Sequence, residues 1–307
     1  MRWGEKRYHS LDYELKQMFK EKVYKIALNG GMTCPNRDGH VVTGGCIFCS
    51  SQWSGDFAGS ARLSIAEQIR QGKADISSKR PVHSYIAYFQ AFTNTYAPVE
   101  TLRALYMEAI ADPEVKILSI ATRPDCLGAD VLALLDEINH IKPVWVELGL
   151  QTIHPETSAY IRRGYELSVF EQAVKELRAI GITVIVHTIL YLPGETKDDM
   201  LDTIHYLNHM DIQEIKLQLL HVLTHTDLAA DYEKHPFYSP DMQDYIQFLG
   251  TCIAQFNPEI VIHRLTGDGP KDLLIAPLWT SNKRTVLNQL HSHLKEQDIW
   301  QGKEYYV

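Results

Sequence analysis

The chain has 307 residues, a formal net charge of −8, 45% hydrophobic residues and 5 cysteines. This is the composition of a globular protein large enough for an α/β domain with an appendage, and so few cysteines exclude a disulfide-stapled scaffold. No apolar run reaches the length of a membrane span, and the charged first 22 residues lack the apolar core of a signal peptide, so we expect a cytoplasmic protein without membrane contact.

Strand-like apolar runs alternate along the chain with segments of helical periodicity. The predicted strands are 23–28, 82–89, 115–121, 144–150, 183–190, 215–220 and 259–262. The predicted helices are 64–78, 99–111, 129–138, 155–162, 169–180, 197–210 and 242–256. This alternation predicts right-handed β–α–β crossovers and a parallel sheet. About six units precede residue 256, too few for a closed eight-fold barrel, so we expect an α/β fold, a partial (β/α)6 barrel.

The pattern weakens after residue 256, where the chain reads F-N-P. We therefore predict two regions: residues 1–255, which form the partial barrel with an N-terminal loop extension, and residues 256–307, a small C-terminal extension. In parallel α/β folds, functional residues collect in the loops that follow the carboxyl ends of the strands. The unusual motifs of this sequence lie in those loops.

Three of the five cysteines lie within sixteen positions, in the loop that follows the first predicted strand. Cys46 and Cys49 have the C-x2-C spacing that lets two thiolates share a metal ion or cluster, and Cys34 lies twelve residues before them. The loop also contains five glycines, which allow a close backbone approach and a turn that returns Cys34 to the other two. We predict that Cys34, Cys46 and Cys49 bind a metal centre.

The number of thiol ligands separates two kinds of site. A structural zinc site is closed by four ligands, and His40 in the same loop is available as the fourth. A four-iron cluster held by three cysteines leaves one iron open to a substrate or cofactor. The other two cysteines, Cys126 and Cys252, each stand alone and are predicted to be small buried residues.

The spacing C-x11-C-x2-C, with Phe48 before the last cysteine, resembles the cluster loop of radical S-adenosylmethionine (SAM) enzymes. The usual spacing there is C-x3-C-x2-C, and the longer loop resembles the branch that contains the Elongator catalytic subunit and its small bacterial relatives. The resemblance covers roughly residues 20–220. It implies a partial radical SAM barrel, one [4Fe-4S] cluster on the three cysteines, SAM as cofactor and a SAM contact for Phe48.

Two further motifs of this resemblance follow predicted strands. Gln90 and the alanine after it replace the glycine pair whose backbone, in the superfamily, holds the amino group of methionine. Residues 147–151 read E-L-G-L-Q, which is similar to a signature whose glutamine reaches the ribose of SAM. The resemblance therefore implies that Gln90, Glu147 and Gln151 bind the cofactor. Glu147 alone is equally typical of a salt-bridge partner in a core.

Two more residues match the superfamily further along the chain. Arg163 lies twelve residues after Gln151 and matches an arginine that pairs with the methionine carboxylate of SAM. His187 opens the segment H-T-I-L-Y-L-P-G-E-T, similar to a strand end where relatives often have an acidic residue for the ribose. A histidine there still forms a hydrogen bond with a hydroxyl. Without the family, Arg163 is also typical of an exposed arginine, and Thr196 of a helix N-cap.

The resemblance implies a radical reaction and a class of substrate. In the superfamily one electron cleaves SAM to methionine and a 5′-deoxyadenosyl radical, so we expect an electron donor such as flavodoxin or ferredoxin. Relatives with this spacing act on the wobble uridine of tRNA. The 307 residues leave no room for the acetyltransferase domain of the Elongator subunit, so we expect only the radical step. That step would convert a carboxymethylaminomethyl group at uridine C5 toward aminomethyl.

Net charge is unevenly distributed, which bears on a tRNA substrate. Residues 1–80 carry +5, residues 81–256 carry −13, and residues 257–307 are neutral. Basic candidates for phosphate contacts are Arg2, Lys6, Arg7, Lys16, Lys20, Lys22, Lys25, Arg264, Lys271, Lys283 and Arg284. Trp279 is a candidate for stacking on a base. Solvated charges and a core aromatic are the alternatives for these residues.

The sequence leaves competing functions open. A different class of protein, a zinc-stabilised binding protein without catalytic activity, would use the same cysteines with His40. Within the radical SAM enzymes, the alternative substrate is a small molecule such as a porphyrin precursor. Lys216 and Gln218 share one side of a predicted strand near the barrel mouth, so we expect one of them to contact SAM or the substrate.

Overall fold

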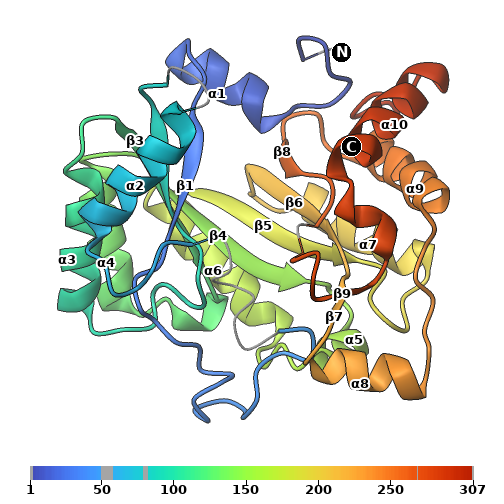
Figure 1. Ribbon diagram of the computed structural model, residues 1–307, viewed down its shortest axis with the longest axis horizontal. Coiled ribbons are helices and arrows are strands. Elements are labelled where there is room, and N and C mark those ends of the chain that lie inside the picture. Colours follow the sequence, from blue (N-terminus) through green and yellow to red (C-terminus); the bar gives the residue numbers. More distant parts are fainter. Residues whose placement is uncertain (1–2, 50–57, 79–81, 268, 306–307) are drawn as a thin grey trace.

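Seven parallel strands form one curled sheet in the computed structural model, which describes residues 3–49, 58–78, 82–267 and 269–305 (Figure 1). The strands are β1 (Tyr24–Leu28), β2 (Tyr85–Phe89), β3 (Val115–Thr122), β4 (Val144–Gln151), β5 (Thr183–Leu190), β6 (Glu214–Leu219) and β8 (Val261–Arg264). They pair in the order β1-β2-β3-β4-β5-β6-β8. Sheet order follows chain order, so successive right-handed crossovers place the connecting helices on the same face of the sheet. The predicted α/β fold with a partial (β/α)6 barrel is confirmed.

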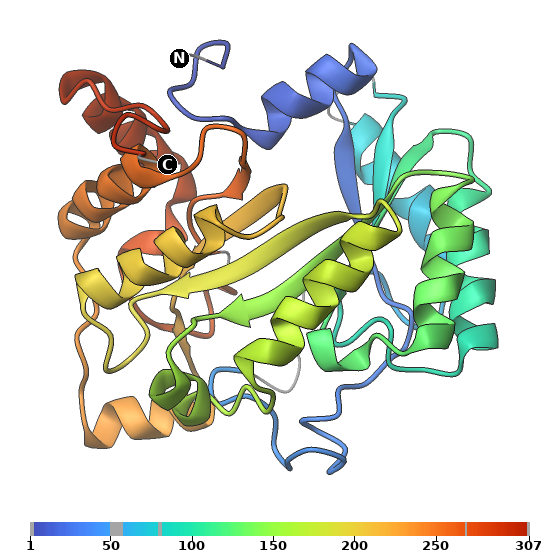
Figure 2. The ribbon, with the colours of Figure 1, turned by 180° about the vertical axis from the view of Figure 1, so that it is seen from behind.

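Helices cover the outer face of the sheet (Figures 1 and 2). Those between the strands are α2 (Ile65–Ser77), α3 (Val99–Ile110), α4 (Ala129–Asn139), α6 (Leu167–Ala179) and α7 (Lys197–Asn208). Capping boxes at Ser64 and Thr196 begin α2 and α7. In each, the hydroxyl accepts from the third helical N–H, and the acidic side chain of that third residue accepts from the backbone N–H of the capping residue. Within the described ranges, no helix has the length and apolar character that crossing a membrane requires.

The C-terminal region extends the barrel rather than standing apart from it. The remaining elements are α5 (Pro155–Tyr160), β7 (Val222–Leu223), α8 (Asp227–Lys234), α9 (Met242–Gln255), β9 (Leu274–Ala276), α10 (Lys283–Glu296) and the 3-10 helices η2 (Pro124–Cys126) and η3 (Leu278–Ser281). β8 follows the boundary predicted at residue 255, yet it pairs with β6. The division into 1–255 and 256–307 stays a prediction.

Side chains alternate along each strand between an outer apolar layer and the barrel interior. On β4, Val146, Leu148 and Leu150 are buried in the main hydrophobic core with the outer helices. Glu147 and Gln151, at the intervening positions, line an interior cavity. The two-residue period of the strand therefore places polar residues in the barrel interior and apolar residues under the helices.

An apolar layer closes the amino-terminal end of the barrel. Its members are Leu15, Val23, Ile86, Ile117, Trp145 and Ile185, with Leu11 and Phe19 packed against them. Leu11, Leu15 and Phe19 come from α1 (Leu11–Phe19), a helix absent from the sequence prediction, which begins at the N-cap Ser10. Nine residues are too few for a clear helical period, and its apolar side is defined by the strands that it covers. This layer is called the plug below.

The two chain termini cover the free edge of β8. Ile262 N–H donates to the carbonyl of His9 at 2.7 Å. The side chain of Gln301 donates to the carbonyls of Asn257 and Ile260 at 2.8 Å and accepts from His9 N–H at 2.7 Å. An edge strand whose backbone groups are paired offers no template for another chain.

Candidate functional site

A cavity of about 1160 Å³ occupies the barrel interior above the plug. All the residues predicted to bind the cluster and SAM lie on its wall: Cys34, Cys46, Phe48, Cys49, Gln90, Glu147, Gln151, Arg163 and His187. They come from the cysteine loop, the ends of β2 and β4, the loop after α5, and β5. The structure brings these residues together, and the role of each stays a prediction.

A buried asparagine holds the cysteine loop against the loop after α5. Asn36 Nδ2 donates to the carbonyl oxygens of Arg162 at 2.7 Å and Arg163 at 3.2 Å, and it lies 3.4 Å from Cys46 Sγ. Gly164, at φ +83°, passes so close that a Cβ there would lie 2.9 Å from Asn36 Oδ1. A side chain at position 164 would push the two loops apart, so the thiols depend on this contact for their position.

The surroundings of the paired thiols favour the thiolate form of Cys46 and the protonated form of Cys49. The hydrogen bond from Cys49 lowers the pKa of Cys46 to about 6; burial opposes this change, whereas Asn36, Arg123 and Arg37 add to it. The same hydrogen bond and burial raise the pKa of Cys49 well above its ordinary value. Because thiolates are the ligands of metals, an electropositive pair of this kind fits metal ligation.

His40 does not join the three cysteines as a fourth ligand. In the part of the chain that the structure describes, no group of three or more His, Cys, Asp or Glu side chains is arranged to hold one metal ion. His40 is exposed, with its ring near Tyr96. The structure gives no support to zinc with His40 as the fourth ligand.

The loop after β2 is held in a fixed conformation where the usual glycine pair is replaced. Gln90 follows β2 directly and lines the cavity. Thr93 N–H donates to the carbonyl of Thr33 at 3.1 Å, which joins this loop to the cysteine loop. Phe92 has φ 63°, and the guanidinium of Arg37 lies 5.2 Å from the centre of its ring. The backbone here is therefore set by the cysteine loop.

β4 ends in a bulge that directs Gln151 into the cavity. The pairing with β5 shifts register between Gly149 and Gln151, and Gln151 has φ 63°. The Gln151 side chain lies over Gly149, where a Cβ would be 2.6 Å from its Nε2. The hydroxyl of Tyr165 donates to the carbonyl of Gly149. Positive φ in a residue other than glycine is strained, and the strain falls on the residue predicted to reach the ribose.

Arg163 is buried and oriented by backbone carbonyls. Its Nε donates to Tyr165 O at 3.1 Å, and its Nη1 donates to Leu150 O at 3.0 Å and Thr152 O at 2.6 Å. These bonds leave the Nη2 protons without a partner among the described residues. The alternative of an exposed arginine is wrong for Arg163; its neighbour Arg162 is the more exposed of the two.

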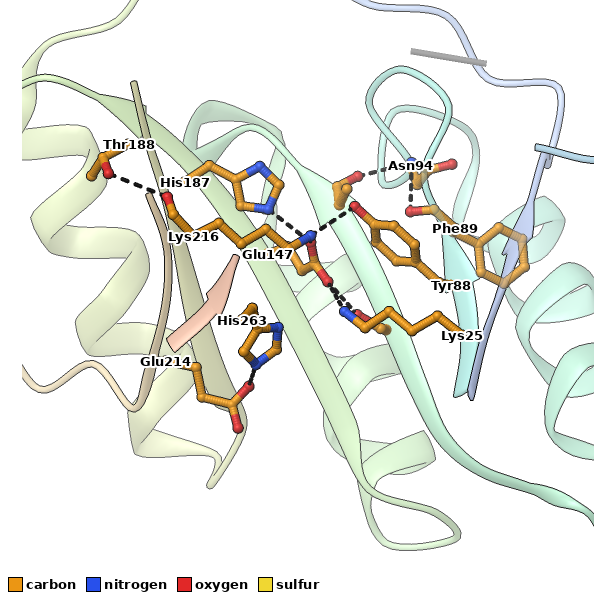
Figure 3. Close-up of polar contacts among 12 residues, drawn as sticks. Lys25, Tyr88, Phe89, Asn94, Glu147, His187, Thr188, Glu214, Lys216 and His263 are labelled. Atoms are coloured by element: carbon orange, nitrogen blue, oxygen red, sulfur yellow. Dashed lines mark hydrogen bonds and ion pairs between the residues drawn. The ribbon is translucent and has the colours of Figure 1, made fainter. Parts of the chain in front are cut away.

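The carboxylate of Glu147 lies at the floor of the cavity and is completely buried. Its Oε1 accepts from Lys25 and from Ser119, each at 2.9 Å. Its Oε2 accepts from His187 at 2.7 Å and forms an ion pair with Lys216 (Figure 3). The four partners come from β1, β3, β5 and β6, so one side chain joins strands from opposite parts of the barrel.

Burial and neighbouring charges set the protonation of this network. Burial alone would raise the pKa of Glu147, but Lys216, Lys25 and His187 hold it well below its ordinary value. Burial lowers the pKa of Lys216 to about 7, although Glu147 opposes the change. Burial and Lys216 lower the pKa of His187 to about 4, so the ring is neutral at pH 7. A neutral ring that donates through Nε2 has Nδ1 as an acceptor, which suits a hydroxyl group.

The basic residues of the N-terminal quarter do not form one phosphate-binding surface. The prediction for Lys25 is wrong, because its ammonium binds the buried Glu147. Arg7 and Lys16 form ion pairs with acidic side chains. Arg2 lies outside the described residues. The pattern of β1 could not show that Lys25 faces inward, because its partner lies 122 residues away.

The basic residues of the C-terminal region lie closer to the cavity than those of the N-terminal quarter. Arg264, Lys271 and Lys283 all line it. Trp279 is a packed aromatic rather than a stacking platform, because its N–H donates to Pro240 O at 2.9 Å and its ring centre lies 5.4 Å from that of Tyr245. Lys271 and Lys283 thus accompany the acidic Asp272 on the wall, and Arg264 lies deeper, beside Lys216.

The remaining sequence predictions have mixed outcomes. Lys216 and Gln218 both line the cavity, in agreement with their alternation on one strand. Cys252 is buried as predicted, whereas Cys126 is only partly buried. Cys126 lies in η2, directly after the end of β3, which explains its position near the cavity mouth rather than in a core.

Sequence reasoning missed several residues of the site. Arg123 follows β3 directly, lines the cavity and donates to the carbonyl of Arg163 at 2.9 Å. The rule that functional residues follow the carboxyl ends of strands would have singled it out. Tyr88 lies two positions before Gln90 and shares its face, so the strand period was a usable signal. Asn36 had no such signal, because its contacts are made across 126 residues.

We predict that Glu147→Gln destabilises the protein by about 3–5 kcal/mol at pH 7.5, because two buried ammonium groups lose their carboxylate. The loss should grow toward pH 5.5. Without Glu147 the pKa of Lys216 falls below 7, so the folded variant releases a proton that the unfolded chain keeps, and its stability falls as the pH falls. Urea unfolding at both pH values measures this, with the exposed Glu137→Gln as the control. An equal loss at both values would contradict the coupling.

Comparison with known proteins identifies the family. The model of the Radical SAM superfamily matches residues 34–207, and the model of the Radical_SAM C-terminal domain matches residues 212–296. Protein YtqA of Bacillus subtilis (strain 168) is 44% identical over 299 residues, which cover 97% of this chain and 93% of YtqA. Protein YhcC of Escherichia coli (strain K12) is 36% identical over 288 residues, 93% of this chain and 92% of YhcC.

Two solved structures share the fold. Archaeal Elp3 from Methanocaldococcus infernus, with residues 1–46 deleted, has a TM-score of 0.69 at 14% identity and matches 91% of this chain. The match spans 64% of Elp3, less than two thirds of its length. Coproporphyrinogen III oxidase (HemN) from Escherichia coli has a TM-score of 0.51 at 15% identity over 77% of this chain and 54% of HemN. At these identities the likeness shows the fold alone.

The superfamily model covers more than half of the chain, including the three cysteines and every residue predicted to contact SAM. The resemblance inferred from the motifs and the cofactors that it implied are thereby confirmed. The chain belongs to the radical SAM superfamily, with an Elongator-like barrel, a [4Fe-4S] cluster and SAM.

Proposed function

We propose that the protein modifies the C5 side chain of the wobble uridine in tRNA, from carboxymethylaminomethyl toward aminomethyl. The observation that carries this proposal is one cavity that has thiols on its wall, fixed charges at its floor and the basic side chains of Lys271 and Lys283 nearer its rim. A polyanion binds such a basic rim, and one nucleotide enters the cavity once it leaves the base stack.

The wall residues divide between cluster and SAM in this proposal. Cys34, Cys46 and Cys49 hold the cluster, and Arg163 offers its Nη2 protons to the methionine carboxylate. Phe48, Gln90, Gln151 and His187 surround the rest of SAM, with His187 Nδ1 as an acceptor for a ribose hydroxyl. When bound, the cofactors supply a 5′-deoxyadenosyl radical that removes a hydrogen atom from an unactivated carbon.

Glu147 acts indirectly in this proposal. Both of its carboxylate oxygens already accept from protein donors, so it has little capacity left for a cofactor hydroxyl. We infer that it holds the neutral ring of His187 and the ammonium of Lys216 in place. An external donor such as flavodoxin or ferredoxin supplies the electron.

A small molecule such as a porphyrin precursor is the second candidate substrate. The volume of the cavity and the fold that the chain shares with HemN favour it. The basic rim is what separates the two candidates, because a small molecule held inside the cavity does not need it.

We predict that Cys46→Ala abolishes both cluster binding and release of 5′-deoxyadenosine, because two thiolates cannot hold the cluster in place. Anaerobic purification, iron analysis and product measurement after chemical reduction test this. Cys252→Ala is the matched control and should keep about four irons per chain, because Cys252 lies in the core. Full activity of Cys46→Ala, or zinc in place of iron, would contradict the assignment.

We predict that Asn36→Ala lowers the iron content while costing about 1–3 kcal/mol of stability, because the donors to the carbonyls of Arg162 and Arg163 are lost. Asn139→Ala is the control. Its amide bonds to Ile180 O and Val144 N near the opposite end of the barrel, so a similar loss of stability should leave the iron content unchanged. Equal iron contents in the two variants would show that Asn36 is only a stabilising residue.

The tRNA substrate is tested by mass spectrometry of tRNA nucleosides from cells with and without the gene. Loss of the gene should accumulate 5-carboxymethylaminomethyluridine at the expense of aminomethyl derivatives. Restoring the gene should reverse the change, and restoring the Cys46→Ala form should not. An unchanged wobble-uridine profile would refute the tRNA proposal and leave the small-molecule candidate.

A further inference from the structure

Three basic side chains form a row on the cavity wall. Strand pairing places His187 beside Lys216, and Lys216 beside Arg264, across β5, β6 and β8. All three line the cavity, at the level of Glu147. Glu147 precedes Gln151 by four residues, about 13 Å along the strand at ~3.3 Å per residue. Lys216 and Arg264 therefore lie below the end of β4, where Gln151 is predicted to contact SAM. His187 is the member of the row with a predicted SAM contact.

Positive charge exceeds negative charge around Lys216. The titratable groups that face it are Lys25 on β1, Tyr88 on β2, Glu147 on β4, His187 on β5, Glu214 on β6, and His263 and Arg264 on β8. Burial raises the pKa of Glu214 to about 8 and lowers the pKa of His263 well below its ordinary value, so this hydrogen-bonded pair carries no net charge at pH 7 (Figure 3). One carboxylate then faces two lysines. The low dielectric constant of the interior strengthens the attraction of these lysines for a further anion.

Lys216 and Tyr88 have donors available on the cavity side of the network. Two of the three ammonium protons of Lys216 have partners in the described ranges, the carboxylate of Glu147 and the hydroxyl of Tyr88 at 3.2 Å. Burial, the charge of Glu147 and a hydrogen bond to Glu147 raise the pKa of Tyr88 well above its ordinary value, so its hydroxyl stays protonated and can turn from Glu147 to donate to a ligand. An ammonium and a phenol that converge in this way match the two oxygens of a carboxylate.

We propose that Lys216 and Tyr88 form a binding site for a carboxylate of the substrate at the floor of the cavity. The proposal rests on the proposed function in one respect: it takes the carboxymethylaminomethyl side chain as the bearer of that carboxylate. Lys25, below Glu147, holds the network without contacting the substrate, because it does not line the cavity. The floor thus recognises the end of the side chain, and the rim binds the RNA.

A carboxylate fits this floor better than a phosphate does. With Lys216 protonated, Lys25, Lys216 and Glu147 carry one excess positive charge, which matches one carboxylate. A phosphate monoester brings nearly two negative charges into a buried space. Backbone phosphates of a nucleic acid stay at the rim, since only an extruded nucleotide reaches the depth of Lys216. The methionine carboxylate of SAM has its own partner in Arg163, in the loop beyond the end of β4.

The first experiment compares two anticodon stem-loop RNAs that differ by one charge. One contains 5-carboxymethylaminomethyluridine at the wobble position, and the other contains the neutral carboxamide analogue. Fluorescence anisotropy under anaerobic conditions measures both dissociation constants with the protein that carries its cluster and SAM. We expect the carboxylate RNA to bind ~10-fold or more tightly, as a hydrogen bond to a charged group predicts. Equal affinities for two RNAs that both bind would overturn the site.

Variants locate the source of the discrimination. Lys216→Met keeps the apolar stem, and it should weaken only the carboxylate RNA, so that the ratio of the two affinities approaches one. Tyr88→Phe, which removes a single hydroxyl, should lower the ratio in part and serves where Lys216→Met fails to fold. Lys271→Met is the matched control at the exposed rim and should weaken both RNAs by the same factor. An unchanged ratio in folded Lys216→Met would overturn the assignment.

A third measurement separates failure of the site from failure of the proposed function. The probes are N-methylglycine and its amide, and NMR of lysine labelled at the ε carbon reports the pKa of Lys216. A bound carboxylate favours the ammonium form, so N-methylglycine should raise this pKa and the amide should not. If neither RNA binds but the pKa rises, the tRNA function is refuted and the carboxylate site stands. If neither RNA binds and the pKa stays unchanged, the site is refuted too.

Discussion

The buried carboxylate of Glu147 is the interaction on which the interior of the barrel depends. A closed eight-stranded barrel fills its interior with layers of branched apolar side chains, whereas here the layer above the plug is charged. Two ammonium groups and a carboxylate leave water at a cost that only close pairing offsets. Lys25, Lys216 and His187 therefore point toward Glu147. Side chains that point toward one another within a layer do not extend into the space above it. The cavity exists because this layer is polar.

Strain collects directly above that layer. Phe92, Gln151 and Tyr191 have positive φ at or just beyond the ends of β2, β4 and β5, and each such residue costs roughly 1–3 kcal/mol. Conformations of this kind persist only where neighbouring contacts determine them. Docking of the cysteine loop, through Asn36, onto the loop at Arg163 provides such contacts. The predicted metal ligands and the strained residues Phe92 and Gln151 are thus parts of one packed assembly.

The sequence was sufficient for whatever depends on local spacing. Alternating elements predicted the partial barrel, and short motifs located the cysteines, Gln151, Arg163 and His187. It was insufficient wherever a residue acquires its role from a distant strand. Lys25 looks like any solvated lysine until the curvature of the sheet brings β1 toward β4, and Asn36 carries no pattern of its own. α1 was missed because its apolar side is defined by the end of the barrel that it closes, not by its own nine residues.

The plug closes the amino-terminal end of the barrel. A macromolecular substrate larger than about 1160 Å³ can then insert only one extruded part of itself, while its bulk remains outside. In the proposed function, affinity and selectivity therefore belong to different places: the rim sets how long a molecule stays bound, and the charged floor distinguishes the substrates that carry the carboxylate. Substitutions at the rim can then change the affinity without changing the selectivity, because different residues form the rim and the floor.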